Sequence, residues 1–420
     1  MPTLVRLAWR NLWRSPRRTA LTLAATVFAV ALTLWTLAMA AGSHERWIDA
    51  VVRLYPGHVE VAARGYRENR TLDYGMRLDP GAGARLDALA DSRGWAPRLE
   101  TWALAIPDRE GQMGRAAWLV GIDPQRERSL TRLAASVATG RFLESRAASR
   151  VAAPRAEVVL GRDLARHLDV GIGDRVILFS TDYYGSQAAD RFRVVGTLEV
   201  GDSQIDGHVV VLRLDQLQSF LEFKGGLSHV ALFADRGDDA ARLAGEVRSL
   251  FSGAHYEVTA WPELIPDMVQ FLELDNLGGW ISVGILIVVV GFGILNTVLM
   301  AVFERVREFG VLRAIGMPPR HVFVLVFVES SLLAGIGIVI GLAVAIPAVL
   351  WLESHPIPMN DEAFQAMSSL FQIEPVIAFS LHRSHLIATP AIIFGVALLA
   401  ALPPALHAAR GRPVDALREI

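Results

Sequence analysis

Four stretches of the chain stay apolar for about twenty residues or more, which is the length that a helix needs to cross a lipid bilayer. Three of them contain no charged residue, and the third in chain order contains only Glu329. A core helix of a soluble protein rarely stays uncharged for so long. We therefore expect four membrane-spanning helices, over residues 19–42, 278–303, 322–352 and 386–406.

The residues before the first apolar stretch follow the period of a helix. At 3.6 residues per turn, one side carries arginines and the other carries apolar residues, namely Arg6, Arg10, Arg14 and Arg17 against Val5, Ala8, Trp9, Leu12 and Trp13. This pattern predicts an amphipathic helix within residues 1–18 on the membrane surface, broken at Ser15-Pro16. A basic flank without a helix is the alternative. The first apolar stretch is too long for the core of a signal peptide, so we expect a retained anchor.

Arginines are distributed unevenly among the short segments outside the four stretches. They are frequent before residue 19, in the loop 304–321 and in the tail 407–420, whereas the loop 353–385 contains only Arg383. Positive charge in short loops marks the cytoplasmic side. We expect both termini in the cytoplasm and residues 43–277 on the outer side of a cell inner membrane.

Short β-like runs alternate with polar, glycine-containing joints over residues 43–277. The runs lie at 58–61, 117–122, 158–160, 175–179, 192–196, 209–212, 229–234 and 256–259, with helical stretches at 163–168 and 238–251. The chain is thus expected to be an α-helical membrane protein with four transmembrane helices and a large α+β extracytoplasmic domain between helices 1 and 2. We expect two lobes in that domain, 43–135 with 227–270, and 136–226.

Composition agrees with this mixed organisation and excludes several classes of function. The 420 residues are 52% hydrophobic and 20% charged, with a mean hydropathy of +0.35 and a net charge of −2, so nothing indicates a nucleic-acid partner. There is no cysteine, which excludes disulfides and cysteine metal sites. Lys224 is the single lysine, and its surroundings do not fit the phosphate-binding loop of an ATPase.

No catalytic or metal-binding constellation stands out in the sequence. The histidines are scattered, and none has the spacing of a zinc site. Asp202, Asp206 and His208 lie close together, but we interpret them as a polar loop before a strand rather than as metal ligands. We expect a non-catalytic chain that binds no metal or cofactor.

The most informative segment follows the second apolar stretch. Residues 293–300 read Gly-Ile-Leu-Asn-Thr-Val-Leu-Met, and residues 304–317 read Glu-Arg-Val-Arg-Glu-Phe-Gly-Val-Leu-Arg-Ala-Ile-Gly-Met. This segment resembles the signature of the FtsX/MacB-type ABC transporter permeases. Glu329, the tail 403–418, the segments 160–165 and 170–174, and Thr259-Ala260-Trp261 are similar to the same family, closest in layout to its lipoprotein-releasing permeases LolC and LolE.

The resemblance implies that the cytoplasmic loop 304–321 is a coupling helix that docks on a separate ABC ATPase, itself a homodimer. The residues expected there are Glu304, Arg305, Arg307, Glu308, Phe309, Gly310, Val311, Leu312, Arg313, Ala314, Ile315 and Gly316. Its apolar side chains lie outside the bilayer within a charged rim, as in protein interfaces. A flank that packs on its own spans is the alternative. ATP and Mg²⁺ would act through the partner, and a second permease chain would complete a homo- or heterodimer.

Several residues within the spans point to packing or function. Glu329 is an ionisable group inside the third span, and we expect it to be paired, with Arg313 or Arg320 as candidate partners, or to take part in gating. Pro390, Pro403 and Pro404 are expected to kink or end the fourth span. Glycines predict close helix contacts at Gly284, Gly291, Gly335, Gly337 and Gly341.

Two functions remain open at the level of the sequence. The first is export or extraction of a lipoprotein, lipid or other amphiphile, driven by movement of the outer domains (mechanotransmission) and passed to a periplasmic carrier or adaptor. The second is an FtsX-like relay that activates a periplasmic hydrolase without transport. The outer domain exceeds 200 residues, which favours export. An anchored outer enzyme is disfavoured because no catalytic set is found.

Overall fold

The computed structural model describes residues 2–89, 92–109, 111–145, 156–235, 237–251, 253, 255–359 and 376–410. They fall into two compact units. The helical unit holds the described residues within 1–44, 271–358 and 376–420, and the sheet unit holds those within 45–270. Each unit has hydrophobic clusters of its own.

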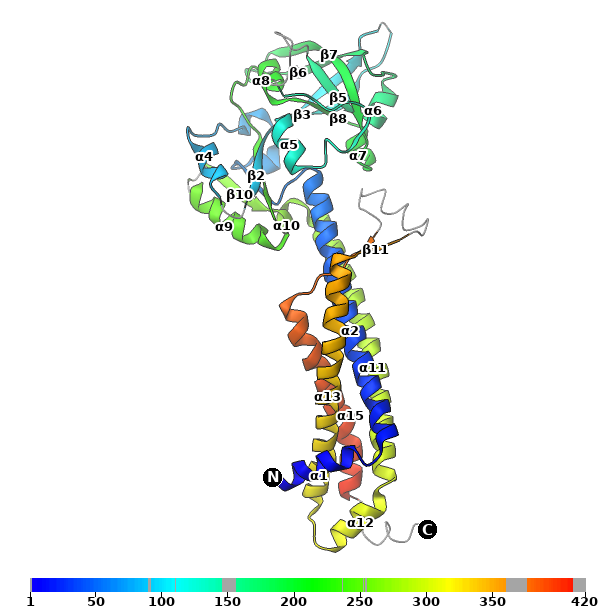
Figure 1. Cartoon of the computed structure of the whole chain (residues 1–420). Helices are drawn as coiled ribbons and strands as arrows, with labels where there is room; N and C mark the ends of the chain where they lie inside the picture. The colour runs from blue at the N-terminus through cyan, green and yellow to red at the C-terminus, as the bar shows by residue number, and fades with distance from the viewer. Residues whose placement is uncertain are drawn as a thin grey trace. The chain divides into compact units, whose positions relative to one another are not determined.

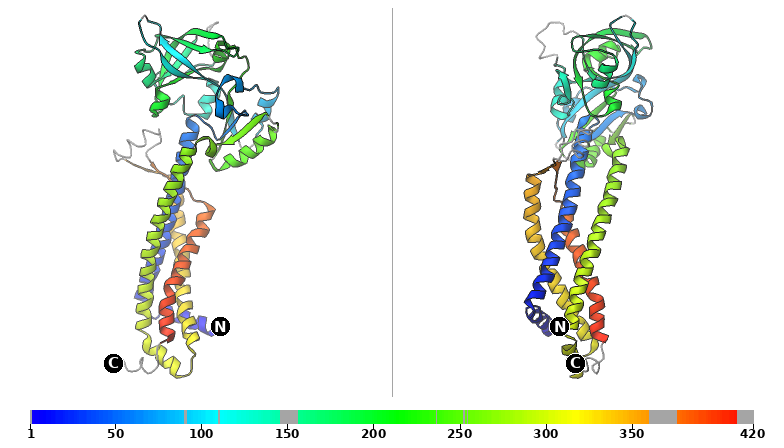
Figure 2. Two further views of the ribbon diagram at one scale, coloured as in Figure 1. Left: turned by 180° about the vertical axis from the view of Figure 1, so that it is seen from behind. Right: turned by 90° about the vertical axis from the view of Figure 1, so that its right-hand side faces the viewer.

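The helical unit consists of four long helices with two short ones at one end (Figures 1 and 2). The helices are α1 (Pro2–Leu12), α2 (Pro16–Leu54), α11 (Pro266–Phe303), α12 (Val306–Ala314), α13 (Pro319–Ser354) and α15 (Arg383–Arg410). In the described part of the chain, four segments are long and apolar enough to cross a membrane, Thr19–Leu54, Pro266–Phe303, Pro319–Ser354 and Arg383–Arg410. Each contains one predicted span, so the expected number of candidate spans is confirmed.

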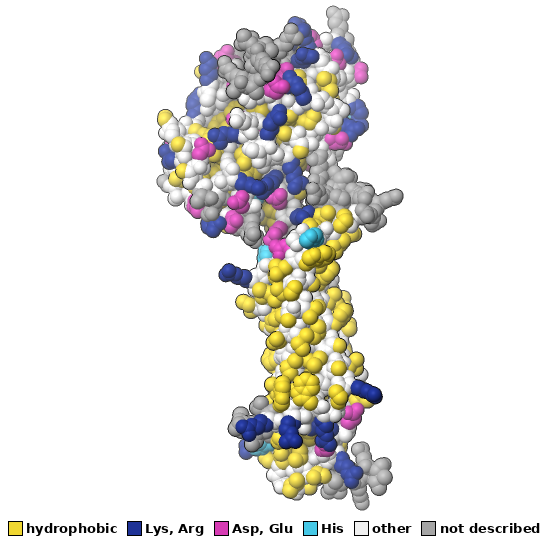
Figure 3. All heavy atoms as spheres, viewed as in Figure 1, with side chains coloured by type: hydrophobic (Ala, Val, Ile, Leu, Met, Phe, Trp, Pro, Cys, Tyr) yellow, Lys and Arg dark blue, Asp and Glu magenta, His cyan; other side chains and the backbone are white. Residues whose placement is uncertain are grey.

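Hydrophobic side chains cover most of the face of the helical bundle that Figure 3 shows. Large apolar residues such as Phe28, Ile285 and Phe292 are exposed along the bundle. A soluble helix would bury such a face, whereas a helix in lipid leaves it toward the acyl chains. The surface of the helical unit therefore agrees with the length and hydropathy of its helices.

Three prolines lie inside α15, at Pro390, Pro403 and Pro404. The sequence predicted that they would kink or end the last span, but the helix continues through all of them to Arg410. The prediction that they end the span is wrong. Within a membrane helix, neighbouring groups and local adjustments satisfy the backbone carbonyls that a proline leaves free.

Two of the five predicted packing glycines lie at a close helix contact. A Cβ atom added at Gly337 would come within 2.7 Å of Thr26 Cβ, and one at Gly341 within 2.7 Å of Val30 Cβ, so only glycine lets α13 approach α2 this closely. At Gly291 the nearest atom, Val396 Cγ1, would be 3.3 Å away. At Gly284 and Gly335 a Cβ would meet no described atom within 4 Å, so these two make no close contact within the described part of this chain.

The sheet unit is built around one ten-stranded sheet. Its strands are β1 (Val59–Ala63), β2 (Ser92–Pro107), β3 (Arg115–Ile122), β4 (Val137–Gly140), β5 (Glu157–Gly161), β6 (Arg175–Thr181), β7 (Gln187–Leu198), β8 (Val209–Arg213), β9 (His229–Ala234) and β10 (Tyr256–Ala260). The order is β10-β1-β9-β2-β3-β8-β5-β7-β4, and β6 pairs with both β2 and β7. The ring β2-β3-β8-β5-β7-β6 thereby closes into a small barrel, in which β3–β8 and β5–β7 are parallel.

Short helices join and cover these strands. They are α3 (Tyr66–Asn69), α4 (Ala82–Asp87), α5 (Pro124–Leu130), α6 (Arg162–His167), α7 (Ser203–Asp206), α8 (Leu214–Phe220), α9 (Ala240–Leu250) and α10 (Trp261–Leu264). All eight predicted strand runs and both predicted helical stretches have counterparts among these elements. The longest strand, β2, was not predicted. A separate two-stranded sheet in the helical unit pairs β11 (Ile357–Pro358) with β12 (Val376–Ile377).

Two hydrophobic clusters occupy opposite halves of β2. Trp95 belongs to a cluster with Val61 and Val230, whereas Leu99 belongs to the barrel core with Leu119 and Leu160. The packing therefore divides the sheet unit inside β2. The predicted lobes, 43–135 with 227–270 and 136–226, place β3 with the first cluster, but Ala117 and Leu119 of β3 pack in the barrel core.

Candidate functional site

The loop between α11 and α13 folds into a short helix held between two turns. Residues Glu304 and Arg305 form the first turn, and α12 follows from Val306 to Ala314. At the other end Gly316 has a φ of +100°, a left-handed conformation that favours glycine. The backbone N–H of Met317 donates to the Leu312 carbonyl at 3.0 Å, and Pro319 then begins α13. α12 is thus a separate element with a defined beginning and end.

The twelve residues predicted to couple to an ATPase lie on different faces of this segment. Phe309 and Gly310 are buried, and Phe309 packs in the bundle core with Val322 and Val326. Half-buried residues are Arg305, Glu308, Leu312 and Arg313, and exposed residues are Glu304, Arg307, Val311, Ala314, Ile315 and Gly316. Phe309 therefore anchors α12 to the bundle, and the larger apolar side chains left on the outside are those of Val311 and Ile315, the latter 78% exposed.

Arg305 is the centre of an ion-pair network that joins three parts of the helical unit. Its Nη1 donates to both carboxylate oxygens of Glu329 in α13, at 3.1 and 2.9 Å, and its Nε donates to Glu308 in α12 at 3.0 Å. The guanidinium also lies 5.2 Å from the ring centroid of Phe309. Arg14, just before α2, reaches the other oxygen of Glu308 at 2.6 Å.

The partner of Glu329 differs from the sequence-based expectation. Arg320 and Glu329 are nine residues apart in α13, which is two and a half helical turns, so they lie on opposite faces. Arg305 instead reaches Glu329 from the turn that follows α11. The expectation that Glu329 is paired is met, with a different arginine from the two that the sequence suggested.

A small cavity with both apolar and polar walls lies beside this ion pair. It has a volume of about 40 Å³, and its walls include both members of the pair together with Thr19, Thr297 and Ser330. A space of this size with these polar side chains in its walls can hold one or two waters, which would hydrate the charged groups. Among the charged residues of the predicted coupling segment, Arg305 is the one that reaches this space.

The predicted amphipathic helix is present as α1, although its apolar residues divide between two surroundings. Ala8 and Leu12 are buried, and Ala8 belongs to the same core as Phe309. Trp9 and Trp13 are exposed and contact each other edge to face, with ring centroids 6.0 Å apart. The Thr19 hydroxyl donates to the Leu12 carbonyl and connects the end of α1 to the start of α2.

A second polar network is buried in the sheet unit, where α2 ends. Arg98 of β2 and Glu127 of α5 are both fully buried and form a two-point ion pair, with N–O distances of 2.8 and 3.2 Å. The Arg98 guanidinium also donates to the Tyr55 carbonyl and lies 3.9 Å from the centroid of the Tyr55 ring. Burial is the largest influence and lowers the pKa of Arg98, but Glu127, Tyr55 and Glu100 together outweigh it, so that the pKa is raised.

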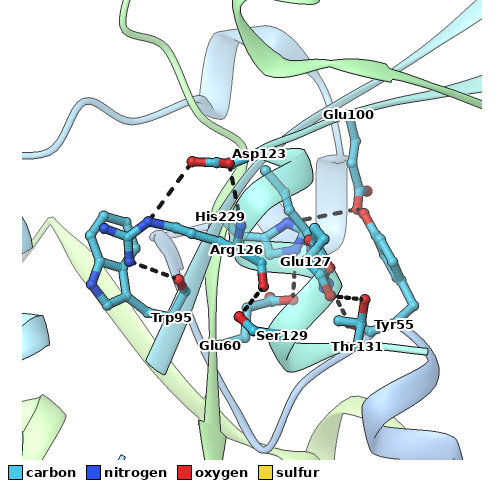
Figure 4. A network of polar contacts seen from close by, with 11 residues as sticks. Tyr55, Glu60, Trp95, Glu100, Asp123, Arg126, Glu127, Ser129, Thr131 and His229 are labelled. Carbon is cyan, nitrogen blue, oxygen red and sulfur yellow. Dashed lines mark hydrogen bonds and ion pairs between the residues drawn. The ribbon is translucent and has the colours of Figure 1, made fainter. Parts of the chain in front are cut away.

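Tyr55, directly after α2, is held from several sides. Its hydroxyl donates to Glu100, and its ring lies nearly perpendicular to that of His229 (Figure 4). The ring of Trp118 is also nearly perpendicular to it, with centroids 5.3 Å apart. Burial, followed by the nearby Glu100 carboxylate, raises the pKa of the Tyr55 hydroxyl well above its usual value, so this group stays a hydrogen-bond donor. The end of α2 is therefore fixed to β2 and α5 by the fully buried Arg98–Glu127 pair and the partly buried contacts of Tyr55.

His58, three residues further on, is completely buried. Its Nδ1 accepts a hydrogen bond from the Ala234 backbone N–H at 3.2 Å, which requires an unprotonated Nδ1. Burial lowers the pKa of His58 to about 4. The unfolded chain therefore binds a proton between about pH 4 and 6.5 that the folded chain does not, and stability falls as the pH falls through that range.

The polar loop with Asp202, Asp206 and His208, which was considered as a metal site, uses these side chains to hydrogen-bond its own backbone. The Asp206 carboxylate accepts from the Val200 and Gly201 N–H groups, the Asp202 carboxylate accepts from Gln204 N–H, and His208 Nδ1 lies 2.9 Å from the Gln204 carbonyl. No group of three or more metal-ligating side chains occurs within the residues that the structure describes. The interpretation as a structural loop agrees with these contacts.

Sequence reasoning missed both networks, although each left a trace. Arg98 and Glu100 place two charges within an otherwise apolar run, a sign of buried pairing, and Arg305 precedes Glu308 by three residues. In both cases the remaining partner is distant in sequence. Glu127 lies 29 residues from Arg98, and Glu329 lies 24 residues from Arg305.

Known proteins resemble this chain over both units. Residues 19–250 match the MacB-like periplasmic core domain, and residues 280–413 match the FtsX-like permease C-terminal region. The lipoprotein-releasing system transmembrane protein LolC of Xylella fastidiosa (strain Temecula1) is 23% identical over 93% of this chain and 91% of its own length. LolE of Haemophilus influenzae is 21% identical over 98% of each chain.

A solved structure, the periplasmic region of MacB from Actinobacillus actinomycetemcomitans, covers 51% of this chain and 94% of its own, at 13% identity and a TM-score of 0.36. The match to the MacB-like core domain by itself spans more than half of the 420 residues. The permease segment around α12 matches the second family model. This chain therefore belongs to the FtsX/MacB-type family of ABC transporter permeases.

Proposed function

We propose that this chain is the membrane subunit of an ABC transporter in which a separate ATPase subunit docks on α12, and that it exports or extracts a lipoprotein, lipid or other amphiphile. The observation that carries the proposal is the two-sided construction of α12. Phe309 fixes one side in the bundle, while Val311 and Ile315 present apolar surface beside the exposed charges of Glu304 and Arg307. An apolar patch within a charged rim is the usual composition of a protein interface.

The ATPase would bind and hydrolyse ATP, and this chain would transmit the resulting movement of the ATPase to its sheet unit. ATP and Mg²⁺ would bind to the partner, with no cofactor held by this chain. Two ATPase subunits and a second permease chain, identical or related, would complete the complex. Both termini and α12 would face the cytoplasm, because positive residues concentrate there. The sheet unit would lie in the periplasm and move the substrate by mechanotransmission.

The lipoprotein-releasing relatives favour an amphiphilic substrate. LolC and LolE match this chain over nearly its whole length, including the sheet unit. A periplasmic carrier or adaptor would receive the substrate.

The proposal is tested by purifying the tagged protein from native membranes in mild detergent and identifying its partners by mass spectrometry. Val311→Asp with Ile315→Asp should abolish recovery of an ABC ATPase, because two charges would enter the apolar patch. Met113→Asp is the matched control, since Met113 is 83% exposed in the sheet unit, and ATPase recovery should be unchanged. Failure of the wild-type protein to recover any ATPase contradicts the proposal.

The periplasmic partner found in the same experiment distinguishes export from signal relay. A lipoprotein carrier or an outer-membrane component supports export. A cell-wall hydrolase, with no carrier, would instead support the relay function.

Leu312→Asp is a less informative variant of α12 than Val311→Asp with Ile315→Asp, because Leu312 packs partly against the bundle core and its substitution would also disturb the fold.

A further inference from the structure

Two ion pairs around α12 differ in their surroundings. The inner pair, Arg305–Glu329, is 14% exposed at both side chains, has contacts to both carboxylate oxygens and borders the small cavity. The outer pair, Arg14–Glu308, has side chains that are 67% and 38% exposed and one contact of 2.6 Å. Breaking a buried pair leaves uncompensated charge, whereas an exposed pair exchanges its contact for water at little cost.

The two pairs also connect different elements. The inner pair joins the turn after α11 to α13, so it ties together two long helices without involving the body of α12. The outer pair joins α12 itself to the residue that lies just before α2. Glu308 also accepts from Arg305 Nε at 3.0 Å, so a displacement of α12 that separates Glu308 from Arg14 can leave Glu308 on Arg305 and Arg305 on Glu329.

We propose that Arg14 and Glu308 are positioning residues that hold α12 in its resting position and release it when the docked ATPase moves, with Arg305–Glu329 as the fixed connection. This inference rests on the proposed docking of an ATPase on α12. The turn at Glu304–Arg305 and the left-handed Gly316 flank α12, so the helix can tilt as one short unit about its buried anchor Phe309. The cavity beside Arg305 would let water hydrate the inner pair during that movement.

A merely structural role for the outer pair predicts a different behaviour. In that case removing it would lower the amount of folded protein and leave the turnover of each assembled complex unchanged. A positioning role predicts normal assembly with altered turnover. The basal ATPase rate of the purified complex, divided by the amount of bound ATPase, separates the two.

The first test uses the complex with its co-purified ATPase and three variants of this chain. Glu308→Gln and Arg14→Gln should each raise the basal ATPase rate about two- to fivefold, the range expected for loss of an exposed pair. Arg14→Gln breaks the outer pair alone, whereas Glu308→Gln also removes the acceptor of Arg305 Nε. The double variant should therefore match Glu308→Gln, because Arg14 has no contact left to lose once Glu308 is neutral. Arg17→Gln removes an exposed arginine from the same region and should leave the rate unchanged.

The second test uses the absence of cysteine from the sequence. Arg14→Cys with Glu308→Cys should be joined by a short bis-methanethiosulfonate cross-linker, which fixes α12 in its resting position. ATP turnover should then fall at least fivefold and recover on reduction, while either single cysteine variant should be unaffected by the reagent.

The outcomes separate the inference from the function on which it rests. If the wild-type chain recovers no ATPase, both are overturned. If the ATPase is recovered and active, but the variants and the cross-linked chain turn over like wild type, the docking function stands and the positioning role of Arg14 and Glu308 is refuted.

Discussion

The buried Arg98–Glu127 pair offers the sharpest test of how the sheet unit is held together. The change is Glu127→Gln, which keeps the size of the side chain and removes its charge. Both side chains of the pair are 0% exposed, so Arg98 would keep a buried positive charge without its two-point partner. Removing one member of such a pair costs about 3–5 kcal/mol.

That free energy is large relative to the stability of a domain, which is about 5–15 kcal/mol. At about 1.4 kcal/mol for each factor of ten, amide exchange through unfolding should become a few hundred- to a few thousand-fold faster in β2 and α5. Hydrogen–deuterium exchange with mass spectrometry measures this on the full-length protein in detergent. Peptides from the helical unit report whether the effect stays within the sheet unit.

Glu157→Gln is the matched control for this change. Arg141 donates to both oxygens of Glu157 at 2.7 and 2.8 Å, but the two side chains are 44% and 24% exposed. Loss of this pair should cost at most about 1 kcal/mol, or about a fivefold change in exchange. Equal effects of the two substitutions would refute the argument from burial.

A double substitution tests whether the loss of stability comes from the uncompensated charge of Arg98. Arg98→Met with Glu127→Leu removes both charges and fills the space with apolar atoms, which is often neutral or stabilising for a buried pair. The double variant should recover at least half of the loss caused by Glu127→Gln. If it is less stable than the single variant, the contacts of Arg98 with Tyr55 outweigh the ion pair, and the uncompensated charge is not the cause.

Three further predictions concern other parts of the molecule. The free energy of unfolding of the sheet unit should fall by about 3 kcal/mol between pH 6.5 and 4, because His58, with its pKa lowered to about 4, binds a proton over this range only when the chain is unfolded. Urea titration should show a flatter pH profile for His58→Asn, whose amide oxygen can still accept from the Ala234 N–H. Gly341→Leu should lower the melting temperature in detergent, because its Cβ would lie 2.7 Å from Val30 Cβ, whereas Gly335→Leu should not, because that position is open. Phe309→Ala should cost about 3–5 kcal/mol and loosen α12, measured as faster proteolysis of the 304–318 loop, and unchanged cleavage would contradict its role as an anchor.

The sequence was sufficient for the features that depend on neighbours along the chain. A bilayer imposes its thickness on every helix that crosses it, so the four spans are visible as uninterrupted apolar stretches. α1 and most strands of the sheet unit are likewise visible as local periodicities. The motif around α12 identified the family because it combines many particular residues at fixed spacing.

β2 shows where local patterns fail. Its 16 residues include Pro97, Arg93, Arg98 and Glu100, which interrupt any alternation of apolar and polar positions. The strand is stable because β3, β6 and β9 pair with it and because Glu127 neutralises Arg98 from another element. The two-lobe division was misplaced for the same reason, since β2 takes part in both hydrophobic clusters.

The sequence by itself determined that this chain has four candidate spans, an α+β domain between the first two, and the permease motif of its family. Only the tertiary structure decided which residues of that motif face outward, which arginine pairs with Glu329, and how Glu308 connects Arg14 with Arg305. The physical reason is distance along the chain. Periodicity and hydropathy report the surroundings that a segment needs, whereas a charge pair between residues 24 or 29 positions apart depends on how the whole chain is folded.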